Sequence, residues 1–199
     1  MGWTKNFGKP EGILGKMILR SMNSGHTPIS KWGLSHYEWK QDTAALDIGC
    51  GGGMNVKRML ELSPRGKAAG IDISEESVKK SRQVNGENLG KRCEIKIGSA
   101  EAIPFEAAQF DVVTAFETIY FWPDIPKSFQ EVGRVLKTGG TFMVICEMSD
   151  PGTIWNKVVE NITVYTPEQL KSFFTEAGFR DIKVSRTKKE WICITGKKA

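Results

Sequence analysis

The sequence lacks the features that would place it in a membrane, in the secretory pathway or around a structural metal. No run approaches the roughly 18 apolar residues of a membrane-spanning helix, and the first residues show no signal-peptide core. No C-x-x-C pair occurs among the four cysteines, Cys50, Cys93, Cys146 and Cys193, so neither a zinc knuckle nor a redox pair is indicated. We therefore expect a cytoplasmic protein with reduced, buried thiols and no metal centre.

The charge balance does not point to a particular partner. The chain has 28 Lys and Arg against 23 Asp and Glu, a net charge of +5, and its basic residues concentrate after Arg180. No RNA-binding signature or row of aromatic residues accompanies them, so we interpret them as a solvated surface and expect no nucleic-acid partner. A length of 199 residues suits one α/β domain. The oligomeric state stays open.

From Thr43 onward, strand-like and helix-like segments alternate, which predicts a doubly wound, mostly parallel α/β sheet with helices on both faces. Gly139 and Gly140 are expected to stop the last helix of this series and release the strand that follows. The expected strands are Ala44–Ile48, Lys67–Ile71, Cys93–Ile97, Phe110–Ala115 and Thr141–Cys146; the expected helices are Met54–Leu62, Glu75–Asn85 with Ser74 as its N-cap, and Ile125–Leu136.

The last part of the chain predicts a helix followed by a reversed strand pair. Thr166 is a suitable N-cap for a helix over Pro167–Ala177. Two strand-like runs follow, Phe179–Val184 and Trp191–Thr195, and the polar link Ser185–Lys189 between them is too short for a crossover helix. The pair should therefore be an antiparallel hairpin.

The main functional signal is the glycine-rich loop after the first strand, which reads D-x-G-x-G-x-G from Asp47 to Gly53. Glycines there let the backbone turn tightly and approach a ligand, and ligands of doubly wound sheets bind near this loop. A dinucleotide fingerprint would require a third glycine where Met54 stands, so that match is incomplete.

The loop resembles motif I of the class I S-adenosylmethionine-dependent methyltransferases, and similarity to that family continues in order over residues 43–198. The further segments are Gly70–Ser74, Gly98–Phe105, Phe110–Val113 with Pro123–Asp124, Arg134–Gly140 and Ala177–Phe179. The resemblance implies a seven-stranded sheet in the order 3-2-1-4-5-7-6, with strand seven antiparallel. It also implies S-adenosylmethionine as cofactor and methyl transfer to a small-molecule acceptor.

The same resemblance suggests which residues hold the cofactor. Asp72 would accept hydrogen bonds from the ribose hydroxyls, and the segment from Gly98 would bracket the adenine. Asp47 would contact the polar parts of the cofactor. The family often has Asp where this chain has Ser99. The complete expected set is Asp47, Gly49, Cys50, Gly51, Asp72, Ile73, Ser99, Ala100, Glu101 and Phe116.

Candidate acceptor-side residues lie in two places. Glu117 and Tyr120 follow the fourth strand, where a carboxylate could hold a cationic acceptor or act in proton transfer and an aromatic ring could stack. The second place is residues 1–42, which we expect to form a helical extension and lid ahead of the methyltransferase domain, residues 43–199. It contains a predicted helix over Glu11–Met22 and a turn-rich stretch with His26, a candidate acid–base group.

Two other functions remain possible from the sequence. One is a nicotinamide-dependent oxidoreductase, which the incomplete fingerprint at Met54 weakens. The other is a non-catalytic methyltransferase-fold protein that serves as a partner subunit. The acceptor atom (nitrogen, oxygen, sulfur or carbon) stays open.

Overall fold

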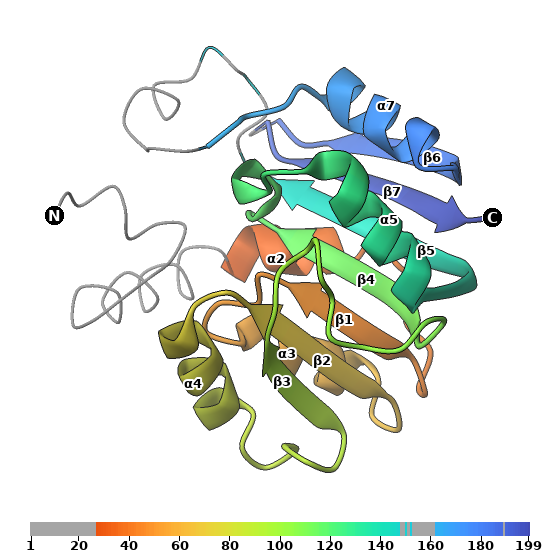
Figure 1. The fold of residues 1–199 in the computed structure, drawn as a ribbon. Coiled ribbons are helices and arrows are strands. Elements are labelled where there is room, and N and C mark those ends of the chain that lie inside the picture. The colour runs from red at the N-terminus through yellow and green to blue at the C-terminus, as the bar shows by residue number, and fades with distance from the viewer. Residues whose placement is uncertain (1–26, 148–149, 151, 153–161, 189) are drawn as a thin grey trace, which may run out of the picture.

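The computed structural model describes residues 27–147, 150, 152, 162–188 and 190–199, and these form a seven-stranded sheet in the order β3-β2-β1-β4-β5-β7-β6 (Figure 1). Strands β1 to β5 pair in parallel, while β7 runs antiparallel to β5 and β6. The predicted topology is confirmed. The strands are β1 (Ala44–Ile48), β2 (Lys67–Asp72), β3 (Cys93–Ile97), β4 (Phe110–Phe116), β5 (Leu136–Cys146), β6 (Phe179–Arg186) and β7 (Ile192–Lys198).

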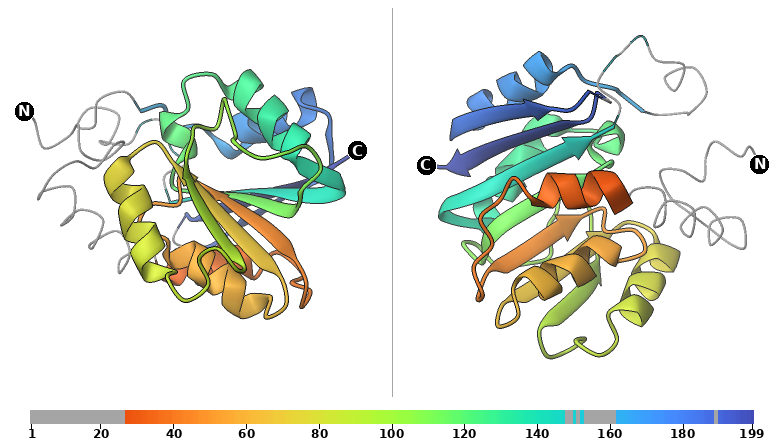
Figure 2. Two further views of the ribbon diagram at one scale, coloured as in Figure 1. Left: turned by 60° about the horizontal axis from the view of Figure 1, so that its bottom comes forward. Right: turned by 180° about the vertical axis from the view of Figure 1, so that it is seen from behind.

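Helices cover both faces of the sheet, as expected (Figure 2). One face carries α2 (Thr27–Leu34), α3 (Met54–Leu62) and α4 (Glu75–Val84), and the other carries α5 (Ile125–Val135) and α7 (Pro167–Glu176). The α5–α7 side is a cluster of aromatic rings built around Phe129, Phe142 and Phe174. None of the described helices is long and apolar enough to cross a membrane.

The predicted helix boundaries agree with the structure where capping signals mark them. The Ser74 hydroxyl accepts the Ser77 N–H at the start of α4. Thr166 and Gln169 form a reciprocal capping box at the start of α7. Each cap satisfies backbone N–H groups that have no partner within the helix, which explains why these residue types fixed the boundary.

One boundary was predicted incorrectly. Gly139 and Gly140 do not stop α5, because that helix ends at Val135 and both glycines lie inside β5. Leu136 is already extended and pairs with Phe110 on β4. The register between β4 and β5 shifts directly after this pair, and Gly139, with a φ of 75°, lies in the irregular stretch opposite. These glycines therefore allow an irregularity within β5, and they do not end a helix.

The described part of the N-terminal extension includes a helix that the sequence did not predict. The predicted helix over Glu11–Met22 lies outside the described residues. Helix α2 begins at Thr27, within a stretch interpreted as a turn; Pro28 suits its first turn, where no intrahelical N–H bond is needed. Near its end, Gly33 lies so close to the sheet that an added Cβ would be 2.8 Å from side-chain atoms of both Phe116 and Ile145. Helix α2 is therefore seated directly over the ends of β4 and β5.

Candidate functional site

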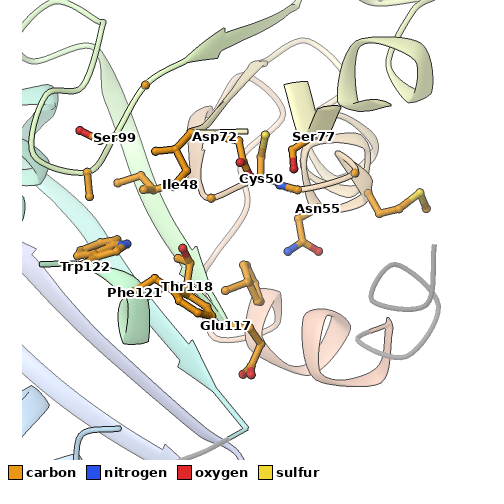
Figure 3. Close-up of a pocket in the computed structure, with 18 of the residues that line it drawn as sticks. Ile48, Cys50, Asn55, Asp72, Ser77, Ser99, Glu117, Thr118, Phe121 and Trp122 are labelled. Carbon is orange, nitrogen blue, oxygen red and sulfur yellow. Dashed lines mark hydrogen bonds between the residues drawn. The ribbon is translucent and has the colours of Figure 1, made fainter. Parts of the chain in front are cut away.

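A cavity of about 310 Å³ lies at the carboxyl edge of the parallel strands, where β1 and β4 are neighbours (Figure 3). Ligand pockets in proteins span roughly 300–1,000 Å³, so it is large enough for a small ligand. It is lined by Ile29 and Ser30 of α2, Ile48–Gly52, Met54, Asn55 and Arg58 of α3, Asp72, Ile73, Ser77, Gly98–Glu101, Phe116–Thr118 and Phe121–Pro123.

The glycine-rich loop forms one wall of this cavity. Its Gly49 has a φ of 71°, and a Cβ there would be 2.3 Å from the Thr118 hydroxyl oxygen. Only glycine meets both conditions without strain. The N–H groups of Gly49 and Cys50 donate to the Ile71 carbonyl at 2.8 and 2.9 Å, which fixes the loop against β2.

Asp72, the last residue of β2, is held by the backbone on both sides. Its Oδ2 accepts the Gly51 N–H and its Oδ1 accepts the Ser74 N–H, each at 2.9 Å. Burial raises the pKa of Asp72, and these two hydrogen bonds oppose the rise. A carboxylate has about four lone-pair positions, so it can still accept bonds from a ligand that fills the cavity. This arrangement fits a pair of ribose hydroxyls.

The predicted adenine contacts lie next to Asp72 along the cavity wall. Ile73 is 47% exposed, unusually high for a large apolar side chain, and it lines the cavity together with Ser99 and Ala100. A buried carboxylate oxygen of Glu101, Oε1, has no hydrogen-bond partner among the described residues. An apolar surface beside an unsatisfied acceptor suits a flat heterocycle that carries an amino group.

Asp47 lies behind the cavity wall and is not one of its lining residues. Its side chain is 1% exposed, and its Oδ1 accepts a hydrogen bond of 2.7 Å from the Thr114 hydroxyl of β4. Burial raises the pKa of Asp47 to about 7, and the nearby Asp72 carboxylate adds to the rise. The structure thus places Asp47 against β4, where its carboxyl group contacts Thr114 and does not line the cavity.

Glu117 and Tyr120 come together at the other end of the cavity. Glu117 follows β4 with a φ of 54°, a conformation that non-glycine residues rarely adopt. One of its carboxylate oxygens accepts the backbone N–H of Glu147, and the other accepts the Tyr120 hydroxyl at 3.3 Å. Burial raises the pKa of Glu117 to about 8. Glu117 lines the cavity, whereas Tyr120 is 3% exposed and lies behind it.

Ten of the thirteen predicted site residues line the cavity; Asp47 and Tyr120 lie behind its wall, and His26 lies outside the described residues. Sequence reasoning missed several lining residues, notably Ser30, Asn55, Arg58 and Thr118. The spacing of Met54, Asn55 and Arg58 along one helical face was a usable signal, because a helix that follows a ligand-binding loop turns its first residues toward the ligand. Nothing comparable marked Ser30.

Comparison with known proteins identifies the family to which this arrangement belongs. A family model described as a methyltransferase domain matches residues 40–178. The demethylmenaquinone methyltransferase of Staphylococcus aureus is 32% identical, over 73% of this chain and 71% of the relative. This chain belongs to the class I S-adenosylmethionine-dependent methyltransferases.

Other relatives extend the comparison to longer proteins and to solved structures. The chloroplastic 2-methyl-6-phytyl-1,4-hydroquinone methyltransferase 1 of Oryza sativa is 28% identical over 73% of this chain, which spans only 44% of that relative's length. A SAM-dependent methyltransferase from Aquifex aeolicus has the same fold, with a TM-score of 0.78 and 18% identity over 92% of this chain and 98% of that one. The cofactor of this methyltransferase family is S-adenosylmethionine, and the cavity described above has residues that fit its ribose, at Asp72, and its adenine, at Ile73, Ala100 and Glu101. In the described part of the chain, no group of His, Cys, Asp and Glu residues could hold a metal ion.

Proposed function

We propose that this protein transfers the methyl group of S-adenosylmethionine to a small-molecule acceptor. The observation that carries the proposal is the fixed carboxylate of Asp72, which opens onto a cavity beside the glycine-rich loop. Asp72 would hold the ribose, and Ile73, Ala100 and Glu101 would hold the adenine. The backbone of Gly49–Gly51 would lie along the amino-acid end.

When bound, S-adenosylmethionine supplies a methyl group on a positively charged sulfur, open to in-line displacement by a nucleophile. The protein's task is then mainly to align the acceptor and exclude water. Phe116 and Phe121 give the acceptor end of the cavity an apolar wall. Glu117 is the ionisable group there, and we propose that its carboxylate accepts the proton of an acceptor hydroxyl. The Tyr120 hydroxyl would hold that carboxylate in place.

The names of the relatives support a small-molecule acceptor. By those names, the relatives methylate a hydroquinone, demethylmenaquinone and, in Caenorhabditis elegans, the 4-carbon of a sterol. A general base such as Glu117 suits an acceptor of this kind, because loss of a hydroxyl proton raises the nucleophilicity of a phenol or of its ring carbons. We propose an apolar acceptor with an ionisable hydroxyl.

We also propose that the N-terminal extension, residues 1–42, closes over the acceptor side as a lid. Ile29 and Ser30 of α2 line the cavity, and Gly33 seats that helix on the sheet. A cover of this kind would keep water from the reacting groups.

A cytoplasmic location is proposed as well, because all four cysteines are free and buried.

Titration calorimetry with the full chain tests the proposed cofactor and activity. S-adenosylmethionine and S-adenosylhomocysteine should bind and NADH should not. A small-molecule extract incubated with the enzyme and with cofactor that carries a deuterated methyl group should yield one labelled product, detected by mass spectrometry. Binding of NADH instead would overturn the proposal. Cofactor binding with no labelled product from any extract would favour a non-catalytic partner subunit.

A further inference from the structure

Arg58 is the only Lys or Arg among the described residues that line the cavity, whose other charged lining residues are Asp72, Glu101 and Glu117. It lies on α3 and is partly buried. The ion pairs formed by the described residues do not include Arg58. A guanidinium in a cavity with no carboxylate in contact is a site for an anionic group of the ligand.

Three neutral oxygens hold the guanidinium of Arg58 in place. Its Nη1 donates to Ser30 Oγ at 3.2 Å and to Asn55 Oδ1 at 3.1 Å, and its Nη2 donates to Thr27 Oγ1 at 2.9 Å. An arginine has five N–H donors. The Nε–H and the second Nη2 hydrogen therefore make no hydrogen bond with the described residues. Burial lowers the pKa of Arg58, and the charges of Glu61 and Asp47, neither of which forms an ion pair with it, oppose this fall only in part.

The neighbouring Asn55 adds a second donor to the same place. Its Oδ1 accepts from Arg58 and also from the Ser30 hydroxyl. Because arginine can only donate, this contact fixes which end of the amide is oxygen. Its Nδ2 makes no hydrogen bond with the described residues, and Figure 3 shows the Asn55 side chain at the cavity. The start of α3 is also electropositive, because Gly53 provides no side-chain cap and the first turn holds no acidic residue.

The position of this cluster decides which anion it would meet. Asp72 and Ile73 place the adenosine at the β2 side of the cavity, and the loop from Gly49 then leads directly into α3. The other half of the cofactor must therefore lie along that loop, and it carries one carboxylate. We propose that Arg58, together with Asn55 and oriented by Ser30, binds the carboxylate of the cofactor's methionyl group. The inference rests on the proposed function, since it takes S-adenosylmethionine as the ligand.

The cluster joins α2 to the cofactor site. Ser30 and Thr27 belong to α2, while Asn55 and Arg58 belong to α3. A carboxylate bound between Arg58 and Asn55 would strengthen a link that already holds the N-terminal helix over the cavity. Cofactor binding and the seating of α2 are therefore expected to be coupled.

A comparison of two ligands tests the assignment by affinity alone. S-adenosylhomocysteine has the carboxylate, whereas S-adenosyl-3-thiopropylamine keeps the adenosine and the amine but lacks it. The variant Arg58→Met should bind S-adenosylhomocysteine about 10- to 100-fold more weakly, because hydrogen bonds to a charged group are lost. Its affinity for the thiopropylamine should change by less than about 3-fold, since that ligand has no group for Arg58 to bind.

Lys57→Met is the matched control, because it removes the same charge from the exposed side of the same helix. It should leave both affinities unchanged. Arg58→Lys, which keeps the charge without the paired donors, should fall between wild type and Arg58→Met for S-adenosylhomocysteine only. Equal weakening of both ligands by Arg58→Met, or no weakening of either, overturns the inference while leaving the proposed function standing. Failure of the wild-type chain to bind either ligand overturns the proposed function itself.

Discussion

The Thr114 hydroxyl of β4 donates a hydrogen bond of 2.7 Å to the buried carboxyl group of Asp47 on β1. This single bond does not offset the loss of hydration, so the pKa of Asp47 is raised to about 7, compared with about 3.9 for an Asp in an unfolded chain. Between those two values the folded protein holds a proton that the unfolded chain has released. Asp47 therefore lowers the stability of the fold progressively as the pH rises from about 4 to 7.

Asp47→Asn should remove this pH-dependent cost, because the amide oxygen can still accept the Thr114 hydroxyl. The variant should match wild type near pH 4 and exceed it at pH 8 by up to about 4 kcal/mol of unfolding free energy. Urea denaturation of both proteins at several pH values measures the difference. Stability curves that stay parallel across this range would contradict the raised pKa.

Asp72 should control cofactor affinity. Asp72→Ala removes the acceptor proposed for the ribose hydroxyls, and binding of S-adenosylhomocysteine should weaken by about 1.5–3 kcal/mol. Asp72→Asn keeps one acceptor oxygen, so its affinity for S-adenosylhomocysteine should fall between those of wild type and Asp72→Ala. The exposed Glu87→Gln, which also removes one negative charge, serves as the control in calorimetry. An unchanged affinity in Asp72→Ala would remove this residue from the site.

Glu117 should set the pH dependence of methyl transfer. Its pKa is raised to about 8 by burial, with the Glu147 carboxylate adding to the rise and the hydrogen bonds from Glu147 N–H and Tyr120 opposing it. A general base acts when deprotonated, so the turnover rate should increase as the pH rises through about 8. Glu117→Gln should lower kcat by about 10²- to 10⁴-fold and flatten the profile, with cofactor affinity retained. A variant that keeps the wild-type profile would show that Glu117 takes no proton.

The fold was largely predictable because its signals are local. Strands with β-branched residues, the caps at Ser74 and Thr166, and the short link Ser185–Lys189 each act within a few residues, and together they fix the order of elements. The error at Gly139 has a different origin. Whether a glycine ends a helix or eases a strand irregularity depends on the strand that pairs with it, and that strand, β4, is distant in sequence.

In the candidate site, too, the residues marked by local patterns were predictable and those brought together by tertiary packing were not. Asp72 and Gly49 belong to one loop-and-strand pattern, so the sequence already marks them as neighbours. Ser30 and Arg58 are 28 residues apart and meet only because α2 packs beside α3. Ser30 belongs to no recognisable motif, and the helical spacing that marks Arg58 does not show that it meets Ser30. Contacts of that kind depend on tertiary packing, which a pattern along the chain does not contain.

The close packing of α2 on the sheet can be tested by comparing alanine substitutions at two helix glycines, Gly33 in α2 and Gly133 in α5. In Gly33→Ala the new Cβ would lie 2.8 Å from Ile145 Cγ1 and Phe116 Cε1, closer than real Cβ contacts. Ile145 is fully buried and cannot move aside freely. We expect unfolding to become easier by about 1–3 kcal/mol, as for other overpacked sites. Because α2 carries Ile29 and Ser30 into the cavity wall, affinity for S-adenosylhomocysteine should fall as well.

Gly133→Ala is the matched substitution, in helix α5 on the opposite face of the sheet. A Cβ there would meet nothing within 4 Å, so the only effect is the better helix propensity of alanine. That should stabilise the protein by about 0.5–1 kcal/mol and leave ligand affinity unchanged. Thermal unfolding with and without S-adenosylhomocysteine reports both quantities. If Gly33→Ala lowers stability but keeps full affinity, α2 supports the fold without forming part of the ligand site, and the proposed lid is wrong.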